Sequence, residues 1–302
     1  MMNQDPYHNK KALVTGASGF IGSHLCNLLN NTGVEVHGVS REKRTTDTTG
    51  TIWWQGDLSK FTDVNHLLND IKPDYIFHLA SYVVGARDLE NIIPTFLSNL
   101  SSTVNLLTCA TKLGCTRIVL VGSQEEPDKG NVIPSSPYAA AKWSAGAYAR
   151  MFHALYSTPV TIARVFMVYG PGQNDLSKLI PYVTLSLLRE QDPKLTGGTR
   201  QIDWVYVEDV AKGLLSLSAS KDVEGCTVDL GSGFLVSIKD TIKKLEKIIG
   251  SKTKPVFGSV PDRPMEQVRV ADVKSTYDKI GWKPAVGLEK GLRTTVDWYK
   301  RR

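Results

Sequence analysis

Residues 11–25 read KALVTGASGFIGSHL, an apolar strand-like run that leads through a glycine-rich turn into the start of a helix. Gly16, Gly19 and Gly22 stand three residues apart in this stretch. Glycine permits a tight turn, and it lets backbone N–H groups approach a pyrophosphate at the positive end of the following helix. The stretch therefore predicts a dinucleotide-binding turn between a first strand and a first helix. The residues expected to contact the cofactor there are Gly16, Gly19, Phe20, Ile21 and Gly22.

Strand-like and helix-length segments alternate from this turn to about Val168. The expected strands are 11–15, 34–39, 51–54, 75–80, 117–122 and 160–168, and helical segments begin near Phe20, Thr62, Pro94 and Tyr138. This alternation is typical of a parallel sheet that helices cover on both faces. Because the glycine-rich turn lies at its first junction, the pattern predicts a Rossmann-type doubly wound α/β fold.

The alternation loosens after YGPGQ at residues 169–173, where helices are expected at about 178–190, 208–220 and 237–249. A chain of 302 residues is long enough for one large α/β domain with a small companion. We therefore expect a cofactor-binding Rossmann domain over residues 1–170. Residues 171–302 would form a small α/β substrate-binding region, parts of which return to the Rossmann core.

The composition is that of a soluble globular protein, with 41% apolar and 22% charged residues. The longest apolar runs have only the length of strands, so no membrane span is expected. The N-terminal residues lack the apolar region of a secretory signal. The formal charge of +6 is scattered along the chain, which favours a phosphate-bearing small molecule over nucleic acid as a partner.

The four cysteines and six histidines show no disulfide or metal pattern. The cysteines include no CxxC pair and lie in apolar contexts, which is typical of buried thiols in a reducing cytoplasm. No pair of histidines has metal-ligand spacing with carboxylates, so no metal site is expected. His78, at the end of an expected strand, is interpreted as structural.

The end of the second expected strand bears on the choice of cofactor. A dinucleotide site usually has an acidic residue here, which binds the ribose 2′-hydroxyl. Residues 37–44 read HGVSREKR, so that Ser40 and Arg41 stand in its place and two further cations follow. Cations suit a 2′-phosphate, which favours NADP(H) over NAD(H), although a solvated basic loop would give the same sequence.

Tyr138 and Lys142 lie four residues apart, on one face of an expected helix. Moving the pKa of a phenol from about 10 towards 7 requires about 4 kcal/mol, which an ammonium and an oxidised nicotinamide could supply. The spacing alone is common by chance, but Ser123 ends the preceding strand beside the expected nicotinamide. The three side chains predict proton exchange with a substrate oxygen while hydride moves to or from the cofactor.

Motifs spread over nearly the whole chain resemble those of extended short-chain dehydrogenases/reductases that modify nucleotide sugars. They occur in the expected order: TGASGFIG, GDL, FHLAS, NLSSTVNLL, VGS, YAAAK, ARVFMVYGPG, DWVYVEDVA and GWKP. The resemblance implies that Tyr138 is the acid/base, that Lys142 holds the ribose and lowers the tyrosine pKa, and that Ser123 polarises the substrate. It further implies support of the lysine by Asn99, adenine contacts by Asp57 and Leu58, and a cofactor loop formed by Leu79, Ala80 and Ser81.

The resemblance leaves the reaction open between ketoreductase, epimerase and 4,6-dehydratase. Gln124 replaces the acid of dTDP-glucose-type dehydratases, while Glu125 matches the glutamate of GDP-mannose-dehydratase-like enzymes. GSQEE at 122–126 and the stretch 256–272 resemble 4-keto-6-deoxy-hexose reductases. The leading expectation is therefore reduction of the 4-keto group of a 4-keto-6-deoxy nucleotide sugar, with Tyr138 as proton donor and Glu125 among the catalytic residues. Alternatives are a 4-epimerase with tightly held NAD(P), a dehydratase, and a non-catalytic cofactor-binding scaffold.

Two positions depart from the family pattern. Met167 stands where asparagine is usual, and Ile202 stands where arginine usually precedes Asp203. Both positions commonly serve the diphosphate-bearing half of the substrate. Residues expected to bind substrate are Ser123, Gln124, Met167, Lys178, Arg200 and Arg263.

The glutamates and one helix each allow two interpretations. Glu125 and Glu126 either act on the substrate or are exposed loop charges. The stripe AGAYARMFHALY at 145–156 would permit a homodimer, and it would equally fit the core.

Overall fold

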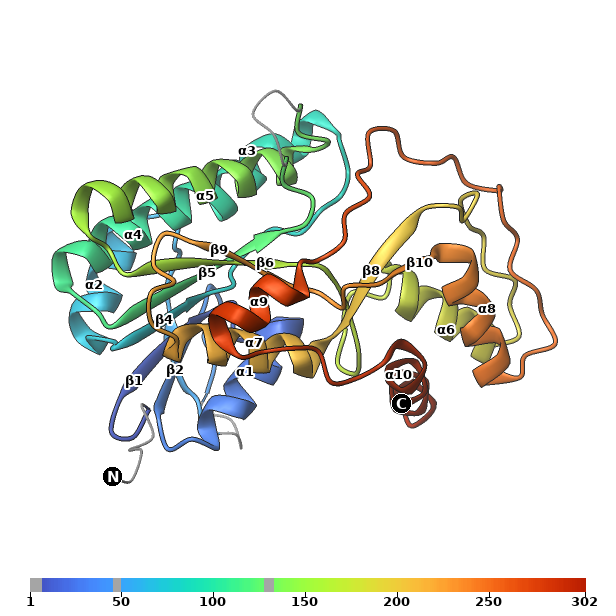
Figure 1. Cartoon of the computed structure of the whole chain (residues 1–302), viewed down its shortest axis with the longest axis horizontal. Helices are drawn as coiled ribbons and strands as arrows, with labels where there is room; N and C mark the ends of the chain where they lie inside the picture. Colours follow the sequence, from blue (N-terminus) through green and yellow to red (C-terminus); the bar gives the residue numbers. More distant parts are fainter. Residues whose placement is uncertain (1–6, 46–49, 128–132) are drawn as a thin grey trace.

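The computed structural model describes residues 7–45, 50–127 and 133–302. Within them, seven parallel strands form the main sheet in the order β3-β2-β1-β4-β5-β6-β9 (Figure 1). This order reverses direction next to β1 and confirms the predicted Rossmann-type doubly wound fold. The strands are β1 (Lys11–Thr15), β2 (Glu35–Ser40), β3 (Ile52–Gln55), β4 (Tyr75–His78), β5 (Arg117–Ser123), β6 (Val160–Val165) and β9 (Thr227–Leu230).

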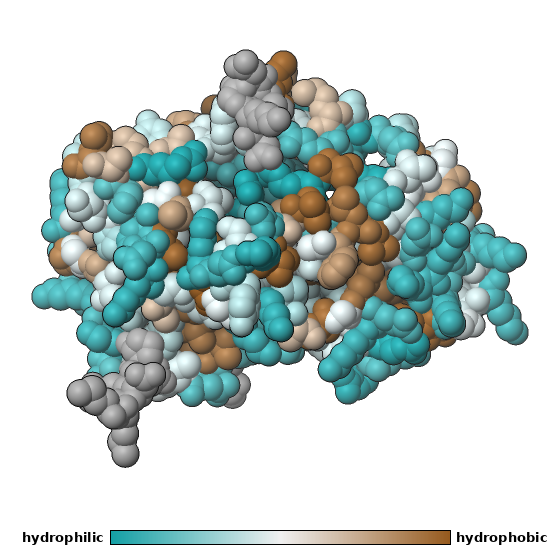
Figure 2. All heavy atoms as spheres, in the orientation of Figure 1, coloured by the Kyte–Doolittle hydropathy of each residue, from teal (hydrophilic) through white to brown (hydrophobic). Residues whose placement is uncertain are grey.

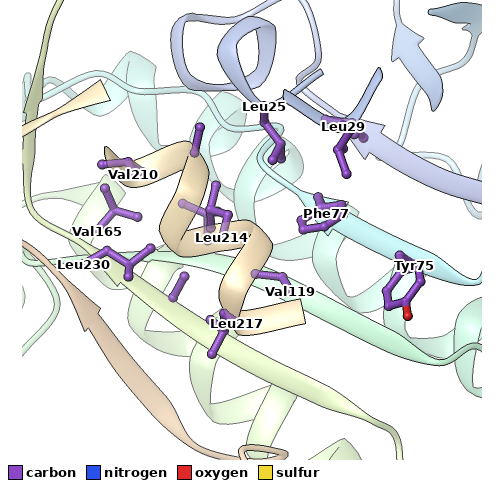
Figure 3. Packing of buried hydrophobic residues seen from close by; sticks show 14 of the residues in the cluster. Leu25, Leu29, Tyr75, Phe77, Val119, Val165, Val210, Leu214, Leu217 and Leu230 are labelled. Atoms are coloured by element: carbon purple, nitrogen blue, oxygen red, sulfur yellow. The ribbon is translucent and has the colours of Figure 1, made fainter. Parts of the chain in front are cut away.

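Helices α1 (Phe20–Asn30) and α7 (Val207–Ala219) pack side by side on one face of this sheet. Figure 3 shows Leu25 and Leu29 of α1 and Leu214 of α7 pointing at the strands. Phe77 and Val119 meet them from the sheet and are fully buried. Helix α9 (Val273–Ile280) lies beside β9. Successive residues of a strand point to opposite faces of the sheet. Val14 therefore packs in the core on the side of α1 and α7, and Leu13 packs in the core on the other side.

The opposite face is covered by α2 (Phe61–Ile71), α4 (Ser102–Leu113) and α5 (Pro137–Tyr156) (Figure 1). The helical segment predicted to begin near Pro94 begins as a continuous helical stretch a few residues earlier, and the chain enters α4 through it. This stretch comprises η1 (Leu89–Asn91), α3 (Ile92–Thr95) and the π-helical η2 (Phe96–Ser101). π-Helical segments are rare in proteins, and those that do occur are often found at functional sites.

A smaller lobe lies beyond the carboxyl end of β6, which leads directly into it (Figure 1). In it β8 pairs in parallel with β7 and antiparallel with β10, and three helices pack around this small sheet. The predicted strand 160–168 is thus two strands, divided at Phe166 and belonging to different sheets. The elements are β7 (Met167–Tyr169), α6 (Leu179–Leu188), β8 (Gln201–Tyr206), β10 (Leu235–Ser237), α8 (Ile238–Ile249) and α10 (Leu288–Lys300).

Elements from beyond Gly170 complete the main layers, since α7 and β9 belong to the larger lobe. The division of the chain near this glycine stays a prediction. Residues 256–272, here called the strap, are the last part of the connection from α8 to α9. They run along the outer side of the smaller lobe and then return between the lobes to α9 (Figure 1). Figure 2 shows the molecule from the side seen in Figure 1. Most residues on this surface are polar, and apolar residues gather between the lobes. No helix in the described part of the chain is long and apolar enough to cross a membrane.

Candidate active site

Close contacts require glycine at two of the three glycine positions of the first turn, Gly16 and Gly22. Gly16 has φ of +69°, and a Cβ there would lie 2.8 Å from the backbone nitrogen of Ala80. A Cβ on Gly22 would lie 2.1 Å from the carbonyl oxygen of Gly16. Gly19 precedes α1 as its N-cap, and no side chain caps the helix there. The exposed N–H groups and the helix dipole suit a pyrophosphate, so this turn fits a dinucleotide. Phe20 and Ile21 form the first turn of α1.

A buried hydrogen-bond network joins this turn to the next strand end. His78 Nδ1 lies 2.8 Å from Thr15 Oγ1, and its Nε2 lies 3.1 Å from Thr103 Oγ1. Thr15 Oγ1 also accepts from the Ala80 N–H at 3.1 Å. Burial lowers the pKa of His78 to about 3, so the ring is neutral. The network fixes Leu79 and Ala80 beside the glycine-rich turn, where the cofactor loop is predicted.

Asn99 lies in the π-helical segment η2 and hydrogen-bonds the remaining residues of this loop, Ser81 and Tyr82. Its Oδ1 accepts from the Tyr82 N–H at 2.7 Å and from the Ser81 hydroxyl at 3.1 Å, while its Nδ2 donates to the Tyr82 carbonyl at 3.2 Å. The predicted support of Lys142 by Asn99 stays a prediction, because the lysine donates to a different group, the Val121 carbonyl.

The end of β2 borders a polar hollow lined by Arg41, Gln55, Gly56, Asp57, Lys60 and Asp63. The Ser40 hydroxyl accepts hydrogen bonds from the Glu42 N–H at 3.2 Å and from Arg44 Nε at 3.3 Å. Burial raises the pKa of Asp57, but hydrogen bonds from Ser59 and nearby cations outweigh it, so the net pKa is lowered and the carboxylate is ionised. Leu58 packs in the core rather than lining this hollow.

Helix α5 begins beside β5 and carries the predicted tyrosine–lysine pair. Ser136 caps it by accepting from the Ala139 N–H at 3.1 Å, and Pro137 occupies the first turn. Lys142 is buried, with Nζ 2.8 Å from the Val121 carbonyl oxygen and 6.0 Å from the centre of the Tyr138 ring. Burial lowers the pKa of Lys142 to about 8, and the Glu126 carboxylate acts in the opposite direction.

Tyr138 and Ser123 lie together at the carboxyl edge of the sheet. Burial and the charge of Glu125 raise the pKa of Tyr138 above its ordinary value, and hydrogen bonding with the Ser123 and Ser81 side chains opposes this. The phenol is therefore protonated in the protein without a cofactor. A cation beside it would be needed to favour the phenolate.

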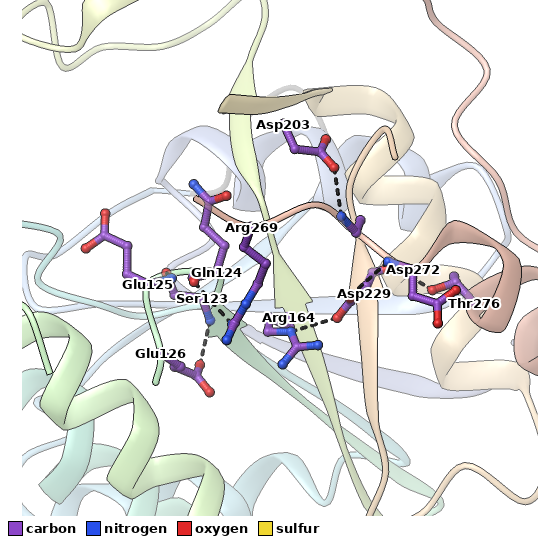
Figure 4. Close-up of polar contacts among 11 residues, drawn as sticks. Ser123, Gln124, Glu125, Glu126, Arg164, Asp203, Asp229, Arg269, Asp272 and Thr276 are labelled. Atoms are coloured by element: carbon purple, nitrogen blue, oxygen red, sulfur yellow. Dashed lines mark hydrogen bonds and ion pairs between the residues drawn. The ribbon is translucent and has the colours of Figure 1, made fainter. Parts of the chain in front are cut away.

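The two glutamates that follow Ser123 differ in burial. Glu126 is 6% exposed, and its Oε1 accepts from the Ser123 N–H at 2.6 Å (Figure 4). The interpretation as an exposed loop charge is therefore wrong for Glu126. Glu125 is half-buried and faces a polar pocket. Burial raises its pKa, while the charges of Arg200, Lys178 and Arg263 act against this.

Sequence neighbours of Ser123 and Tyr138 line this polar pocket, which we call the sugar-side pocket after the substrate class that the sequence resemblance leads us to expect. It brings together the predicted residues Gln124, Glu125, Arg200 and Arg263. Arg200 forms an ion pair with Glu266 of the strap at 2.8 Å. The lining residues are Gly85, Arg87, Gln124, Glu125, Ser135, Ser136, Arg200, Arg263, Glu266 and Gln267.

Arg87 is the main pocket residue that the sequence analysis missed. Its Nε donates to the Ser135 carbonyl at 2.6 Å, and its Nη2 donates to the Pro264 carbonyl. It therefore joins the loop after β4, the start of α5 and the strap. Its position after the carboxyl end of β4, where ligands bind in such sheets, could have identified it.

Three other predicted or marked residues lie outside the pocket lining. Met167 and Ile202 pack with the apolar cluster of the smaller lobe. Lys178 precedes α6, with Nζ 3.6 Å from Asp175 Oδ2. Substrate contacts by Met167 and Lys178 stay predictions.

The chain is similar in sequence and fold to known proteins. The model of the NAD dependent epimerase/dehydratase family matches residues 12–231. The chain is 29% identical over 315 residues to UDP-glucuronate 4-epimerase from Thermodesulfobacterium geofontis, with 95% of each covered. The UDP-glucose 4-epimerase of Thermotoga maritima, solved with UDP-glucose, superposes with a TM-score of 0.88 at 25% identity, covering 96% of this chain and 99% of that one. The UDP-glucuronic acid 4-epimerase of Bacillus cereus, solved with UDP-glucuronic acid and NAD, gives 0.85 at 27% identity with the same coverage.

Proposed function

Since the chain belongs to the NAD dependent epimerase/dehydratase family and is an enzyme of the extended short-chain dehydrogenase/reductase type, we propose that it is a nucleotide-sugar 4-epimerase. The observation that carries this proposal is the meeting of Ser123, Tyr138 and Lys142 beside the sugar-side pocket. The glycine-rich turn fits a dinucleotide whose nicotinamide end would reach the same sheet edge.

The side chains divide the proton chemistry among them. A bound nicotinamide cofactor supplies a hydride acceptor for C4 and then a hydride donor. Tyr138 takes the proton of the sugar O4 hydroxyl during oxidation and returns it during reduction. Ser123 hydrogen-bonds the same oxygen, and the Lys142 ammonium favours the phenolate. For the C4 epimer to form, the hydride would have to return to the opposite face of C4, so the 4-keto sugar would turn over in the pocket between the two transfers. The proton would return through Tyr138, and the cofactor and the tyrosine would end as they began.

The pocket lining favours a sugar with a polar C6 substituent. The residues that line the sugar-side pocket are polar or charged, apart from one glycine. The C6 methyl of a 6-deoxy sugar would gain no apolar contact there, whereas hydroxyl or carboxyl groups would find hydrogen-bonding partners. This supports epimerisation of a hexose or hexuronate over the reductase reaction that the sequence analysis preferred.

Reduction of a 4-keto nucleotide sugar is the second candidate, and the end of β2 favours it. Arg41 and Lys60 line the hollow where a 2′-phosphate would lie, together with the carboxylates of Asp57 and Asp63, and Ser40 ends the strand beside it. NADPH is the usual carrier of that phosphate in reductions. We infer that NADP(H) binds here in preference to NAD(H). Arg41→Ala should weaken NADPH binding about tenfold and leave NADH binding unchanged, since a charge-assisted hydrogen bond contributes roughly 1.5–3 kcal/mol. Fluorescence titration of both cofactors checks this, with Lys221→Ala, which removes an exposed lysine after α7, as the control. Equal effects of Arg41→Ala on both cofactors would contradict the inference.

One assay separates the two reactions. The purified protein is incubated with UDP-, dTDP- and GDP-linked hexoses and hexuronates plus NAD or NADP, and with 4-keto sugars plus NADPH. Epimerisation gives the C4 epimer by NMR with no net change in cofactor absorbance, whereas reduction consumes NADPH in proportion to product. Tyr138→Phe should lower either rate by about 10²–10⁴-fold while cofactor binding persists. Full activity of that variant would reject the proposed role of the tyrosine.

We also propose that the active protein is a cytoplasmic homodimer. Helix α5 carries the exposed apolar residues Tyr148, Leu155 and Tyr156, and the adjoining segment exposes Ile93 and Phe96. A second copy of the chain would cover this face. All four cysteines are free thiols, which suits a reducing compartment. Sedimentation velocity should give a dimer, and Leu155→Arg should shift it to monomer.

A further inference from the structure

The part of the strap that borders the sugar-side pocket has little backbone support. Residues 261–268, here called the lid, belong to no helix or strand, and Arg263, Glu266 and Gln267 among them line the pocket. Within the described part of the chain, no backbone–backbone hydrogen bond joins the lid to another segment. The lid residues are exposed, apart from the half-buried Glu266 and Gln267. Segments of this kind open locally at low cost.

Arginine side chains from both lobes hold the lid instead. Arg87 of the larger lobe donates through Nη2 to the Pro264 carbonyl. Arg200, which precedes β8 in the smaller lobe, donates through Nη2 to the Gln267 carbonyl at 3.3 Å. Its Nη1 lies 2.8 Å from Glu266 Oε1 in an ion pair. Both arginines also line the sugar-side pocket, so the groups that hold the lid are groups that a ligand anion would meet.

The guanidinium of Arg200 is covered on both of its hydrogen-bonding edges. Arginine binds a phosphate or carboxylate best through two neighbouring nitrogens, either Nη1 with Nη2 or Nε with Nη2. Nη1 and Nη2 are engaged by the lid, and Nε is buried without a hydrogen-bond partner among the described residues. A phosphate can therefore bind Arg200 through two nitrogens only if the lid moves away from it.

The carboxylate of Glu266 competes for Arg200 with any anion in the pocket. Carboxylate and phosphate bind a guanidinium with the same geometry, so they exclude each other at one edge. The side chains of Arg200 and Glu266 are 19% and 25% exposed, and ion pairs that reach solvent are weak enough to exchange. The pocket lining carries three arginines and two glutamates, a balance that attracts an anionic ligand.

We propose that Glu266 is a specificity-determining residue of the sugar-side pocket, which holds the lid on Arg200 until the phosphate of a nucleotide sugar takes its place. A ligand shifts such an equilibrium only by its different affinity for the two arrangements. The phosphate has this difference, because it binds Arg200 only when Glu266 has left. A ligand without phosphate does not release the lid. The inference rests on the proposed function, because it takes the ligand to be a nucleotide sugar.

The hold on the lid is measured first without any ligand. A nitroxide spin label is attached through Met265→Cys, at an exposed position in the lid, and the labelled protein without this change gives the background of the native cysteines. Glu266→Gln should make the label clearly more mobile in its EPR spectrum. Glu289→Gln is the matched control, since it breaks an Arg–Glu pair of the same 2.8 Å length on α10, and it should leave the spectrum unchanged.

The same label tests the exchange of Glu266 for phosphate. UDP, dTDP and GDP are added in turn, with NAD or NADPH present to fill the dinucleotide site. The diphosphate that binds should mobilise the label when Glu266 is intact, whereas uridine, thymidine and guanosine should leave it restrained. A nucleoside that mobilises the label as strongly as its diphosphate would overturn the role of the phosphate.

Calorimetric titration of the same diphosphates gives the energetic side of the exchange. Glu266→Gln removes the competing carboxylate, so the affinity for the diphosphate that binds should rise about two- to fivefold, the range for a partly exposed ion pair. In an Arg200→Ala background, Glu266→Gln should no longer change this affinity, because its effect passes through Arg200.

The remaining outcomes separate this proposal from the proposed function. Weaker diphosphate binding by Glu266→Gln would show that the carboxylate supports the ligand, and the proposal would fail. A label that does not respond to Glu266→Gln would also reject it. If the label responds to Glu266→Gln but no diphosphate binds to the unaltered protein, the proposed function and the exchange with phosphate both fail, and only the hold of Glu266 on the lid stands.

Discussion

His78 illustrates how a titratable side chain beside an active site can be fully structural. Its two ring nitrogens lie against Thr15 and Thr103, which tie together β1, β4 and α4. The ring is 1% exposed, and the charge of Lys142 adds to burial in lowering its pKa. A neutral histidine therefore supports the loop that the cofactor is expected to contact, and it moves no proton itself.

This burial predicts a pH-dependent stability. The pKa of His78 falls from 6.5 in the unfolded chain to about 3 in the fold, so between these values the unfolded state binds one more proton. The free energy of unfolding should therefore decrease as pH falls below 6.5, by about 2 kcal/mol from this group at pH 5. Urea unfolding at pH 7 and pH 5 should show a smaller difference for His78→Gln than for the unaltered protein. Equal differences in the two proteins would contradict the assignment.

Among single residues, the sequence named those expected to carry the chemistry more readily than those that support them, and their roles stay predictions. Ser123, Tyr138 and Lys142 were identified because their spacing and order follow strand and helix ends. Arg87 was not assigned, since its contacts with Ser135 and Pro264 join segments distant in sequence. Glu126 was left between a role on the substrate and an exposed loop charge, because sequence alone does not report its burial. Ile202 is a departure from the family pattern that the structure places in an apolar cluster, away from the sugar-side pocket.

At the element scale, the β1–α1 turn combines packing with ligand binding. Gly22→Ala would press a methyl group on the Gly16 carbonyl, from which it would lie 2.1 Å without rearrangement. The variant should lose about 3 kcal/mol of stability, and cofactor affinity should fall at least tenfold. Thermal unfolding and NADH titration measure the two effects. Gly287→Ala is the matched control, because nothing lies within 4 Å of a Cβ there, and it should cost less than about 1 kcal/mol.

Sequence patterns predicted most of the helices and strands, and they failed at residues 160–168, where the chain passes from the seven-stranded sheet to the three-stranded sheet. The helices expected at 208–220 and 237–249 are α7 and α8 with ends shifted by one residue or less. The run 160–168 was read as one strand because both of its halves are apolar. Only the pairing of β7 with β8 assigns its second half to another sheet. Periodicity reports burial, but it does not report which neighbour provides it.

At the scale of the whole molecule, two carboxylates fasten the strap to both lobes. Asp203 of β8 accepts from the Ala271 N–H at 2.9 Å, and Asp229 of β9 accepts from the Asp272 N–H at 3.1 Å (Figure 4). Arg269 of the strap also donates to the Gln124 carbonyl at 3.2 Å. The position of the strap therefore depends on the relative position of the lobes, and pocket residues such as Glu266 depend on the strap.

The larger lobe should not fold without residues beyond Gly170. A fragment ending there lacks α7 and β9, so the apolar side chains of α1 and the strands that α7 covers would meet water. We expect this fragment to aggregate or to bind a hydrophobic dye strongly, whereas the full chain should unfold in one cooperative transition with little dye binding. A monomeric, cooperatively folding fragment would show that the division near Gly170 marks an independent domain.

Because α7 comes late in the sequence, the ribosome makes most of the strands that it covers before it makes α7. Phe77, Val119 and Leu25 are made well before Leu214, which buries them. At about 5–20 residues per second, the 50 or so residues from Gly170 to the end of α7 take roughly 3 to 10 seconds to add. During that interval the nascent chain presents one bare apolar face of a nearly finished sheet. Ribosome-bound chains stalled before α7 are therefore the form of this protein most dependent on chaperones.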